Sequence, residues 1–329
     1  MRGIMETTKG GCEMATTNIG YDDKLVSATT GEVFDLKAGT KIVSPEEQKR
    51  KQEWAVARAK QKEDYALEDA LRGTWYSIVV RDDNSIFGDV SGATINKIIY
   101  LGTYMDNYNA LRKSYNRVVD SETGKAMYQS VYMTKQDVWN LLGGTKRLFY
   151  NFWNEAIEHH LLEEEDGKVY IMRNVFSYGS TKKIDKKKYA MVQMYKHAIR
   201  YMYENTNDQT RKWLVYLYTL IPYLNLKYNV LCINPFEQDK ENIKPLTMGD
   251  ICERLGRDRR DQTRILRGLK KLHFIDKQGD ERSVIKILWD YKNEDRNWIS
   301  INPQFYAGYV NGIEMQQLTD LFAIGENSF

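Results

Sequence analysis

The chain has 329 residues, of which 28% are charged and 42% hydrophobic, as expected for a soluble globular protein of two or three domains. The formal net charge is only +3, so any affinity for nucleic acid has to come from a local basic patch. The three cysteines form no CxxC pair and lie at no metal-ligand spacing from a histidine, so we expect no metal and no cofactor. Without a signal peptide or a membrane-spanning stretch, the sequence predicts a cytoplasmic protein.

The N-terminal part of the chain differs in composition from the rest. Residues 1–44 are rich in Gly, Thr and Lys and predict a flexible tail with at most one short hairpin. Ser44, Pro45 and Glu46 are typical of a helix start, with an N-cap serine and proline in the first turn. The sequence therefore predicts a charged helix over residues 45–72, either a solvated connector or an arm that docks on a partner or on DNA.

The remainder of the chain repeats itself. In each copy a helix is followed by a turn-rich connection, two further helices and a β-hairpin. The elements lie at residues 96–105, 133–143, 145–160 and 161–172 in the first copy, and at residues 212–221, 246–256, 261–273 and 284–301 in the second. Thr134 and Leu162 match Thr247 and Ile275, both at an offset of 113 residues. Two segments in register indicate an internal repeat.

Each copy reads as a three-helix bundle closed by a two-stranded wing. The predicted fold class is α+β, mainly α with small β-hairpins, arranged as two tandem winged helix-turn-helix domains. The expected domains are residues 73–181 and 212–311, joined by a basic linker or helix over residues 182–211. Apolar residues recur at helical spacing within residues 186–211, so an alternative is that this segment is a helix packed on the second domain. Residues 312–329 are expected to be a C-terminal tail or helix.

The second copy contains a well-marked helix-turn-helix. Thr247 is a plausible N-cap with Asp250 as its capping-box partner, and Gly256 ends the helix where a positive φ is needed. In the next helix Ile265, Leu269 and Leu272 recur at helical spacing and should face the core. The opposite face then carries a basic stripe, namely Arg260, Arg264, Arg267 and Lys271.

This basic stripe lies in the most positive part of the chain. Residues 254–271 contain eight basic and two acidic residues, and five of the basic ones are arginines within residues 257–267. The alternative is a solvated helix face, but so many arginines repel one another unless an anion neutralises them. Arginine forks match guanine edges and phosphate oxygens, so the pattern favours a recognition helix in a DNA major groove.

We expect the DNA contacts to come from the turn, the recognition helix and the wing of the second copy. The candidate residues are Arg257, Arg259, Arg260, Gln262, Thr263, Arg264, Arg267, Lys271, Lys277, Arg282 and Lys286, with Lys292 further along the wing. The wing residues are expected to touch flanking phosphates.

The first copy differs in charge. Its second helix and the linker supply secondary DNA-binding candidates, which are Lys146, Arg147, Tyr150, Asn151, Asn154, Lys182 and Lys183. Its wing is acidic over residues 163–166, however, and these four charges would lie near phosphates if it docked like the second copy. Two alternatives remain: DNA binding through the helix alone, or a protein-interaction and dimerisation module.

Tandem winged helices with a more basic second copy resemble the replication initiators of theta-replicating plasmids and their phage counterparts. The segment Asn302-Pro303-Gln304-Phe305 is similar to an N-P-x-aromatic strand end in replication proteins of small Gram-positive plasmids. The resemblance covers roughly residues 73–311. It implies two domains that straddle repeats in a replication origin, a homodimer formed through the first domain, and contacts with host replication proteins in a bacterial cytosol.

No catalytic motif points to an enzyme. The chain has no Walker A motif, no GxGxxG and no HExxH, and it lacks the His-x-His metal motif of rolling-circle initiators. The expected function is therefore sequence-specific binding of double-stranded DNA by a replication initiator. A transcriptional repressor or activator is the first alternative, and a protein-binding adaptor is the second.

Overall fold

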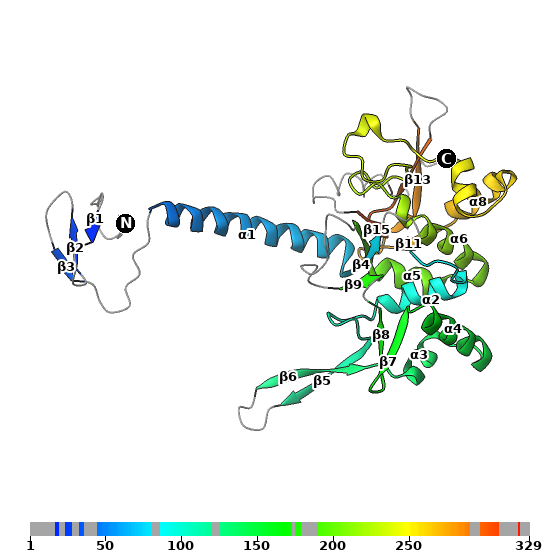
Figure 1. Ribbon diagram of the computed structural model, residues 1–329, viewed down its shortest axis with the longest axis horizontal. Coiled ribbons are helices and arrows are strands. Elements are labelled where there is room, and N and C mark those ends of the chain that lie inside the picture. The colour runs from blue at the N-terminus through cyan, green and yellow to red at the C-terminus, as the bar shows by residue number, and fades with distance from the viewer. Residues whose placement is uncertain are drawn as a thin grey trace. The chain divides into compact units, whose positions relative to one another are not determined.

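The computed structural model of the chain describes residues 17–19, 24–27, 33–35, 45–80, 86–119, 125–172, 175–178, 190–289, 297–308 and 322. Two compact units, Met1–Ala66 and Leu67–Phe329, divide the chain. The described part is mixed α+β, with α-helices, small antiparallel sheets and hairpins (Figure 1). Within these ranges no helix is long and apolar enough to cross a membrane.

The first unit contains more strand than the single hairpin expected for residues 1–44. A three-stranded antiparallel sheet is formed by β1 (Thr17–Ile19), β2 (Lys24–Ser27) and β3 (Val33–Asp35). The predicted charged helix is α1 (Pro45–Arg72), which begins in this unit and ends in the second one. Trp54 of this helix is 66% exposed, so its side chain is directed largely to solvent.

The second unit has two halves. The first half consists of β4 (Trp75–Val80), α2 (Gly92–Gly102), β5 (Arg112–Val119), β6 (Ala126–Tyr132), α3 (Lys135–Leu142), α4 (Lys146–Glu158), β7 (Leu162–Glu165), β8 (Lys168–Ile171) and β9 (Phe176–Ser177). Strands β5 and β6 form a long hairpin that projects from the rest, and β7 and β8 form a shorter one (Figure 1).

The second half follows a similar order. It consists of β10 (Ala190–Tyr195), α5 (Lys196–Asn205), α6 (Asp208–Thr219), the 3-10 turns η1 (Ile221–Tyr223) and η2 (Lys240–Asn242), α7 (Met248–Arg254), the 3-10 turn η3 (Arg259–Asp261), α8 (Gln262–Lys270), β11 (His273–Ile275), β12 (Glu281–Ser283), β13 (Ile285–Trp289), β14 (Asn297–Ile301) and β15 (Tyr306–Ala307). The C-terminal tail or helix predicted at residues 312–329 lies outside the described residues, except for the buried Phe322.

A four-stranded sheet with the order β15-β10-β4-β9 joins the two halves. Each half begins and ends in this sheet, because β4 pairs with β9 of its own half and β10 pairs with β15. The halves meet where β4 and β10 run antiparallel, with Ile78 opposite Val192. Both side chains are fully buried, so the junction between the halves is part of the hydrophobic core.

Matched hydrogen bonds support the internal repeat. The amide of Ile171 donates to the carbonyl of Asn109 (2.8 Å), and in the second half the amide of Ile301 donates to that of Asn229 (3.0 Å). Both asparagines have positive φ, at 64° and 54°, a conformation that Asn tolerates better than most residues. Each asparagine lies where the chain turns and then pairs with a strand of a hairpin, β8 in the first half and β14 in the second.

The helix starts repeat as well. Thr134 caps α3 and Thr247 caps α7, and each forms a complete capping box, with Asp137 and Asp250 respectively. The prediction for Thr247 and Asp250 is therefore confirmed. These reciprocal bonds satisfy amides that a helix N-terminus otherwise leaves unpaired.

Two local predictions are wrong. The helical spacing noted within residues 186–211 does not hold at residues 190–195, which form the strand β10. Val192 and Met194 are buried there, and Gln193 between them is half-buried. This alternation is typical of a strand. The hairpin predicted at residues 284–301 does not follow the third helix of the second copy directly, because a separate hairpin, β11–β12, lies before it, and the predicted hairpin is β13–β14. In the strand pairing of the first half, Leu162 lies opposite Ile171. The equivalent pair in the second half is Ile285 and Ile301. The partner of Leu162 in the repeat is therefore Ile285 and not Ile275.

Candidate nucleic-acid interface

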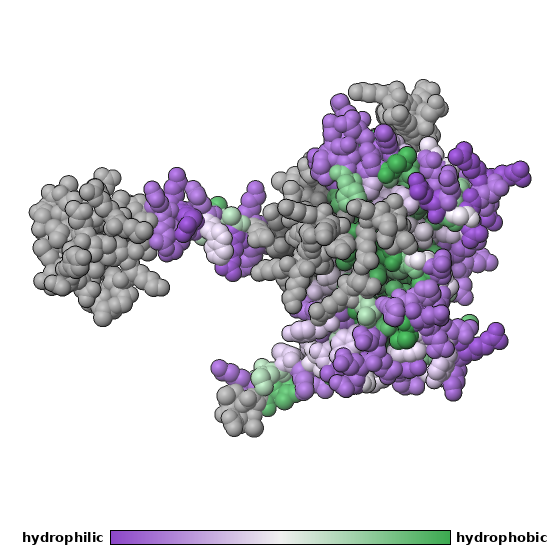
Figure 2. All heavy atoms as spheres, in the orientation of Figure 1, coloured by the Kyte–Doolittle hydropathy of each residue, from purple (hydrophilic) through white to green (hydrophobic). Residues whose placement is uncertain are grey.

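Helix α8 presents the basic stripe that the sequence predicts. Ile265, Leu269 and Leu272 are at most 1% exposed and pack into the core. The side chains of Arg260, Arg264, Arg267 and Lys271 are all exposed, as is Thr263, whereas Gln262 is half-buried. In Figure 2 the surface around α8 is strongly hydrophilic. The helix therefore has one face committed to the protein and one basic face directed to solvent.

A close contact with α6 sets the position of α8. The ring of Trp213 lies directly over Gly268, so that a Cβ added to this glycine would come within 2.3 Å of the ring carbons. The absence of a side chain lets the two helices approach each other at this point. The orientation of the basic face relative to the core thus depends on one glycine and one tryptophan.

We expect Gly268→Ala to lower the free energy of unfolding by about 1–2 kcal/mol, because the overpacking cost exceeds the gain of about 1 kcal/mol in helix propensity. Thermal unfolding measures the loss. The double variant Gly268→Ala/Trp213→Leu should recover part of it, since the smaller side chain leaves room for the methyl group. Equal stability of Gly268→Ala and the parent would contradict the close packing described for these helices.

The turn before α8 is built from the residues that the sequence singles out. Gly256 has φ +62°, as predicted for the end of the preceding helix. The Asp258 carboxylate accepts the amide of Arg260 (2.8 Å) and so caps the turn η3. Arg257 and Arg259 are exposed in the same segment. The loop therefore extends the positive surface of α8 at its N-terminal end.

Nearby carboxylates offset part of this positive charge. Arg264 lies 3.0 Å from Asp261, Arg259 lies 3.8 Å from Glu253 and Arg260 lies 4.0 Å from Asp258 (side-chain N to O). Exposed pairs of this kind contribute about 0–1 kcal/mol each, so an anionic ligand can displace them at little cost. Arg267 and Lys271 have no such pair among the residues that the structure describes.

The wing candidates divide into two groups. Lys277 is exposed in the turn between β11 and β12, and Lys286 is half-buried in β13. The Arg282 side chain is only 14% exposed and pairs with Asp276 (2.7 Å) and Asp280 (3.0 Å). Burial acts to raise the pKa of Asp276, but hydrogen bonds from Arg282 and from backbone amides outweigh it and lower the pKa overall. Arg282 therefore holds the hairpin together and is not available to phosphates; Lys292 lies outside the described residues.

In the first half, α4 also exposes its predicted outer face. The side chains of Lys146, Arg147, Tyr150, Asn151 and Asn154 are all exposed, while Phe149, Phe152, Trp153 and Ala156 are buried. Leu148 is 56% exposed on the same helix, which makes this surface more apolar than that of α8. The acidic residues 163–166 are exposed in and beside β7. Lys182 and Lys183 lie outside the described residues.

A basic cavity between the halves was not predicted from the sequence. It has a volume of about 510 Å³ and lies where α2 packs against α6, and its lining includes Lys97, Arg211, Lys212 and Arg257. Burial and the charge of Arg211 lower the pKa of Lys97. The sequence placed Lys97 and Lys212 in the first helix of each copy, but only the packing of the two copies brings them beside Arg257.

The long hairpin β5–β6 was also missed, because its sequence reads as a charged, turn-rich connection. Tyr115, Val119, Met127 and Tyr128 are 53–70% exposed along it. Figure 2 shows hydrophobic residues on this hairpin, and in Figure 1 it points away from α4 and α8. An exposed ribbon of this composition is typical of an interaction surface.

No protein-family model, no curated protein and no solved structure matches the chain.

Proposed function

We propose that the chain is a sequence-specific double-stranded DNA-binding protein in which α7 and α8 form a helix-turn-helix and α8 enters the major groove. The observation that carries the proposal is the exposed basic face of α8, opposite its buried face. An α-helix with its side chains is about 10–12 Å across, so the nine-residue helix α8 fits a groove about 12 Å wide. Thr263 and Arg264 lie in its first turn, where recognition helices contact bases, and Arg267 lies in its last turn.

The two halves are proposed to be tandem winged helices. In each half, a helix, a capping-box helix, an outward-facing helix and a hairpin follow one another, with β7–β8 and β13–β14 as the wings. In Figure 1, α4 and α8 both lie toward the same side of their unit, so a single duplex could contact both. The basic cavity lined by Lys97 and Lys212 would lie between the two contacts.

Within this proposal the chain acts as a plasmid or phage replication initiator. The support is the tandem arrangement together with the segment from Asn302 to Phe305. Asn302 closes this turn by donating from its side chain to the Ser283 carbonyl (2.9 Å) and accepting the Gln304 amide (2.8 Å). A transcriptional regulator on the same scaffold is the alternative, and it differs in the kind of DNA site that it binds.

A protein-binding role for the first half is a second candidate. Its acidic hairpin, the exposed Leu148 on α4 and the apolar residues of the β5–β6 hairpin all favour a protein partner over phosphates. The partner would be a second copy of this chain or a host replication protein. The two roles are compatible, because the features lie in the first half and the basic face of α8 lies in the second.

Selection of duplexes from a random pool, followed by affinity measurements at several salt concentrations, tests the DNA-binding proposal. We expect an enriched sequence, and an affinity that falls about 10²–10³-fold between 50 and 200 mM salt if about five phosphates are neutralised. Directly repeated sites beside an AT-rich segment would indicate an initiator, whereas a site overlapping a promoter would indicate a regulator. No enrichment, combined with an affinity insensitive to salt, would reject DNA binding.

A further inference from the structure

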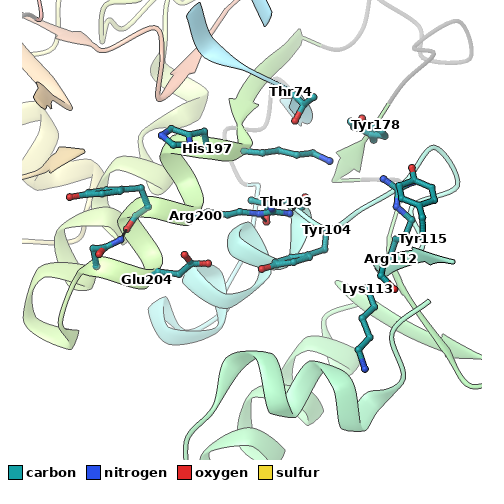
Figure 3. Close-up of a pocket in the computed structure, with 14 residues that line it drawn as sticks. Thr74, Thr103, Tyr104, Arg112, Lys113, Tyr115, Tyr178, His197, Arg200 and Glu204 are labelled. Atoms are coloured by element: carbon teal, nitrogen blue, oxygen red, sulfur yellow. Dashed lines mark hydrogen bonds between the residues drawn. The ribbon is translucent and has the colours of Figure 1, made fainter. Parts of the chain in front are cut away.

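A second pocket, which does not involve α8, lies between the first half and helix α5 of the second half. Its volume is about 590 Å³, and it is formed by the end of α2, the base of β5, Tyr178 and the length of α5 (Figure 3). It shares no lining residue with the basic face of α8. The volume falls within the range of about 300–1,000 Å³ that is usual for small-molecule sites.

Four lysine and arginine side chains line this pocket, and three of them, Lys196, Arg200 and Arg112, form a cationic cluster. Lys196 is 9% exposed, and its Nζ donates to the Met105 carbonyl (3.2 Å). Arg200 donates to the hydroxyl and the carbonyl of Thr103, both at 2.9 Å. Since each cation uses only some of its donors on these partners, donors remain for a ligand.

Each of these cations also lies over a tyrosine ring. Lys196 is 4.0 Å from the ring centroid of Tyr178, and Arg200 is 4.2 Å from that of Tyr104. Arg112 is 4.1 Å from the ring of Tyr115. The rings hold the cations in place by cation–π attraction without neutralising their charge.

The positive charge of the pocket is only partly balanced. No ion pair to Lys196, Arg200 or Arg112 occurs in the part of the chain that the structure describes. Burial, followed by the charges of Arg200 and Arg112, lowers the pKa of Lys196 to about 7, while Asp106 acts in the opposite direction. Lys113 is already paired with Asp137 (2.7 Å). Glu204, the carboxylate in the pocket lining, accepts the hydroxyl of Tyr100 (2.7 Å).

We propose that this pocket binds a small phosphate-bearing molecule of the nucleotide class, with its phosphates against Arg112, Lys196 and Arg200. Guanidinium forks and an ammonium group are the usual partners of phosphate oxygens. The pocket is larger than a phosphate group needs, and its wall includes a further tyrosine, Tyr201, whose ring offers a surface on which a base stacks. A phosphate also supplies the negative charge that the cluster lacks.

Calorimetric titration of the full chain with ADP, inorganic phosphate and adenosine tests this site. We expect one ADP per chain, competition by inorganic phosphate, and at least tenfold weaker binding of adenosine, which has no phosphate. Arg112→Gln and Lys196→Met should each weaken ADP binding about tenfold, the effect of losing one charge-assisted hydrogen bond. The matched control is Arg117→Gln, an exposed arginine of the same strand outside the pocket lining, which should bind ADP as the parent does.

The pH dependence gives an independent readout. Above pH 7 the phosphate charge is nearly constant, because its second pKa is about 6. Free Lys196, with a pKa of about 7, must then take up a proton to pair with phosphate. ADP affinity should therefore fall as the pH rises from 7 to 9, and Lys196→Met should lose this slope. The other charged or titratable side chains around Lys196 are Arg112, Lys113, His197, Arg200, Glu204 and Asp106, and the slope that is lost in Lys196→Met is the part that belongs to Lys196.

Two results would overturn the proposal. One is the absence of ADP and inorganic phosphate binding at concentrations up to about 10 mM, well above a Kd of 1 mM. The other is ADP binding that survives Arg112→Gln but is lost in Arg264→Ala/Arg267→Ala, which would place the phosphates on α8. If circular dichroism shows that Lys196→Met is unfolded, Arg112→Gln alone decides the assignment, since Arg112 lies at the pocket edge and is only half-buried.

Discussion

The double variant Arg264→Ala/Arg267→Ala should bind the selected DNA site about 100- to 1,000-fold more weakly than the parent at physiological salt. Each base-reading arginine contributes about 1–3 kcal/mol, and 1.4 kcal/mol corresponds to a factor of ten in affinity. Both side chains are exposed on the outer face of α8, where their removal leaves the buried Ile265 and Leu269 in place. Fluorescence anisotropy with the selected and a scrambled duplex measures affinity and specificity together.

Controls separate loss of contact from loss of fold. Arg117→Ala removes another exposed arginine, on the β5–β6 hairpin, and should leave DNA affinity near that of the parent. Arg282→Ala breaks the ion pairs with Asp276 and Asp280 and should lower the melting temperature while changing DNA contacts little. Unchanged affinity and specificity in the double arginine variant would show that α8 is not the recognition helix.

Asn229→Ala should destabilise the second unit by about 3–5 kcal/mol. The buried side chain donates to the carbonyls of Ile301 (2.8 Å) and Tyr306 (3.0 Å) and accepts the amide of Gly308 (3.1 Å). Each buried polar group left without a partner costs about 1–3 kcal/mol, and alanine at φ 54° adds about 1–2 kcal/mol of backbone strain. At 2–4 °C per kcal/mol, the melting temperature should fall by roughly 10 °C.

Three further variants separate these causes. Asn229→Gly removes the bonds but tolerates the positive φ, so it should be about 1 kcal/mol more stable than Asn229→Ala. Asn229→Asp keeps the shape but places a carboxylate against two carbonyl oxygens, and should be no better than alanine. Asn109→Ala should cost less, because the equivalent side chain donates to one carbonyl among the described residues, that of Phe176 (2.9 Å). Similar losses for Asn109→Ala and Asn229→Ala would contradict this account.

Features that depend on near neighbours in the chain could be predicted from the sequence. The buried and exposed faces of α4 and α8 follow from residue spacing, because a helix repeats every 3.6 residues. The capping box of Thr247 and Asp250 and the positive φ of Gly256 likewise depend only on local geometry. The basic face of α8 was predictable for this reason.

Features that depend on distant partners could not be predicted in the same way. The strand β10 has polar and apolar residues that also fit a helix, and its pairing with the distant strands β4 and β15 fixes it as extended. Arg282 was predicted to contact phosphates like the basic residues near it in sequence, but its guanidinium forms ion pairs with Asp276 and Asp280. Arg112 and Lys196 are far apart in sequence, so no spacing rule could bring them into one pocket.

The shared sheet has a mechanical consequence for any ligand that contacts both halves. Tandem domains on a flexible tether adapt to targets of variable separation, because the tether absorbs the difference. Here the strands β4 and β10 are hydrogen-bonded along their full lengths and buried, so sliding or rotation of one half would break that ladder. The shared sheet therefore fixes the distance between α4 and α8. If the proposed DNA duplex contacts both helices, adaptation to a different spacing has to come from bending of the duplex.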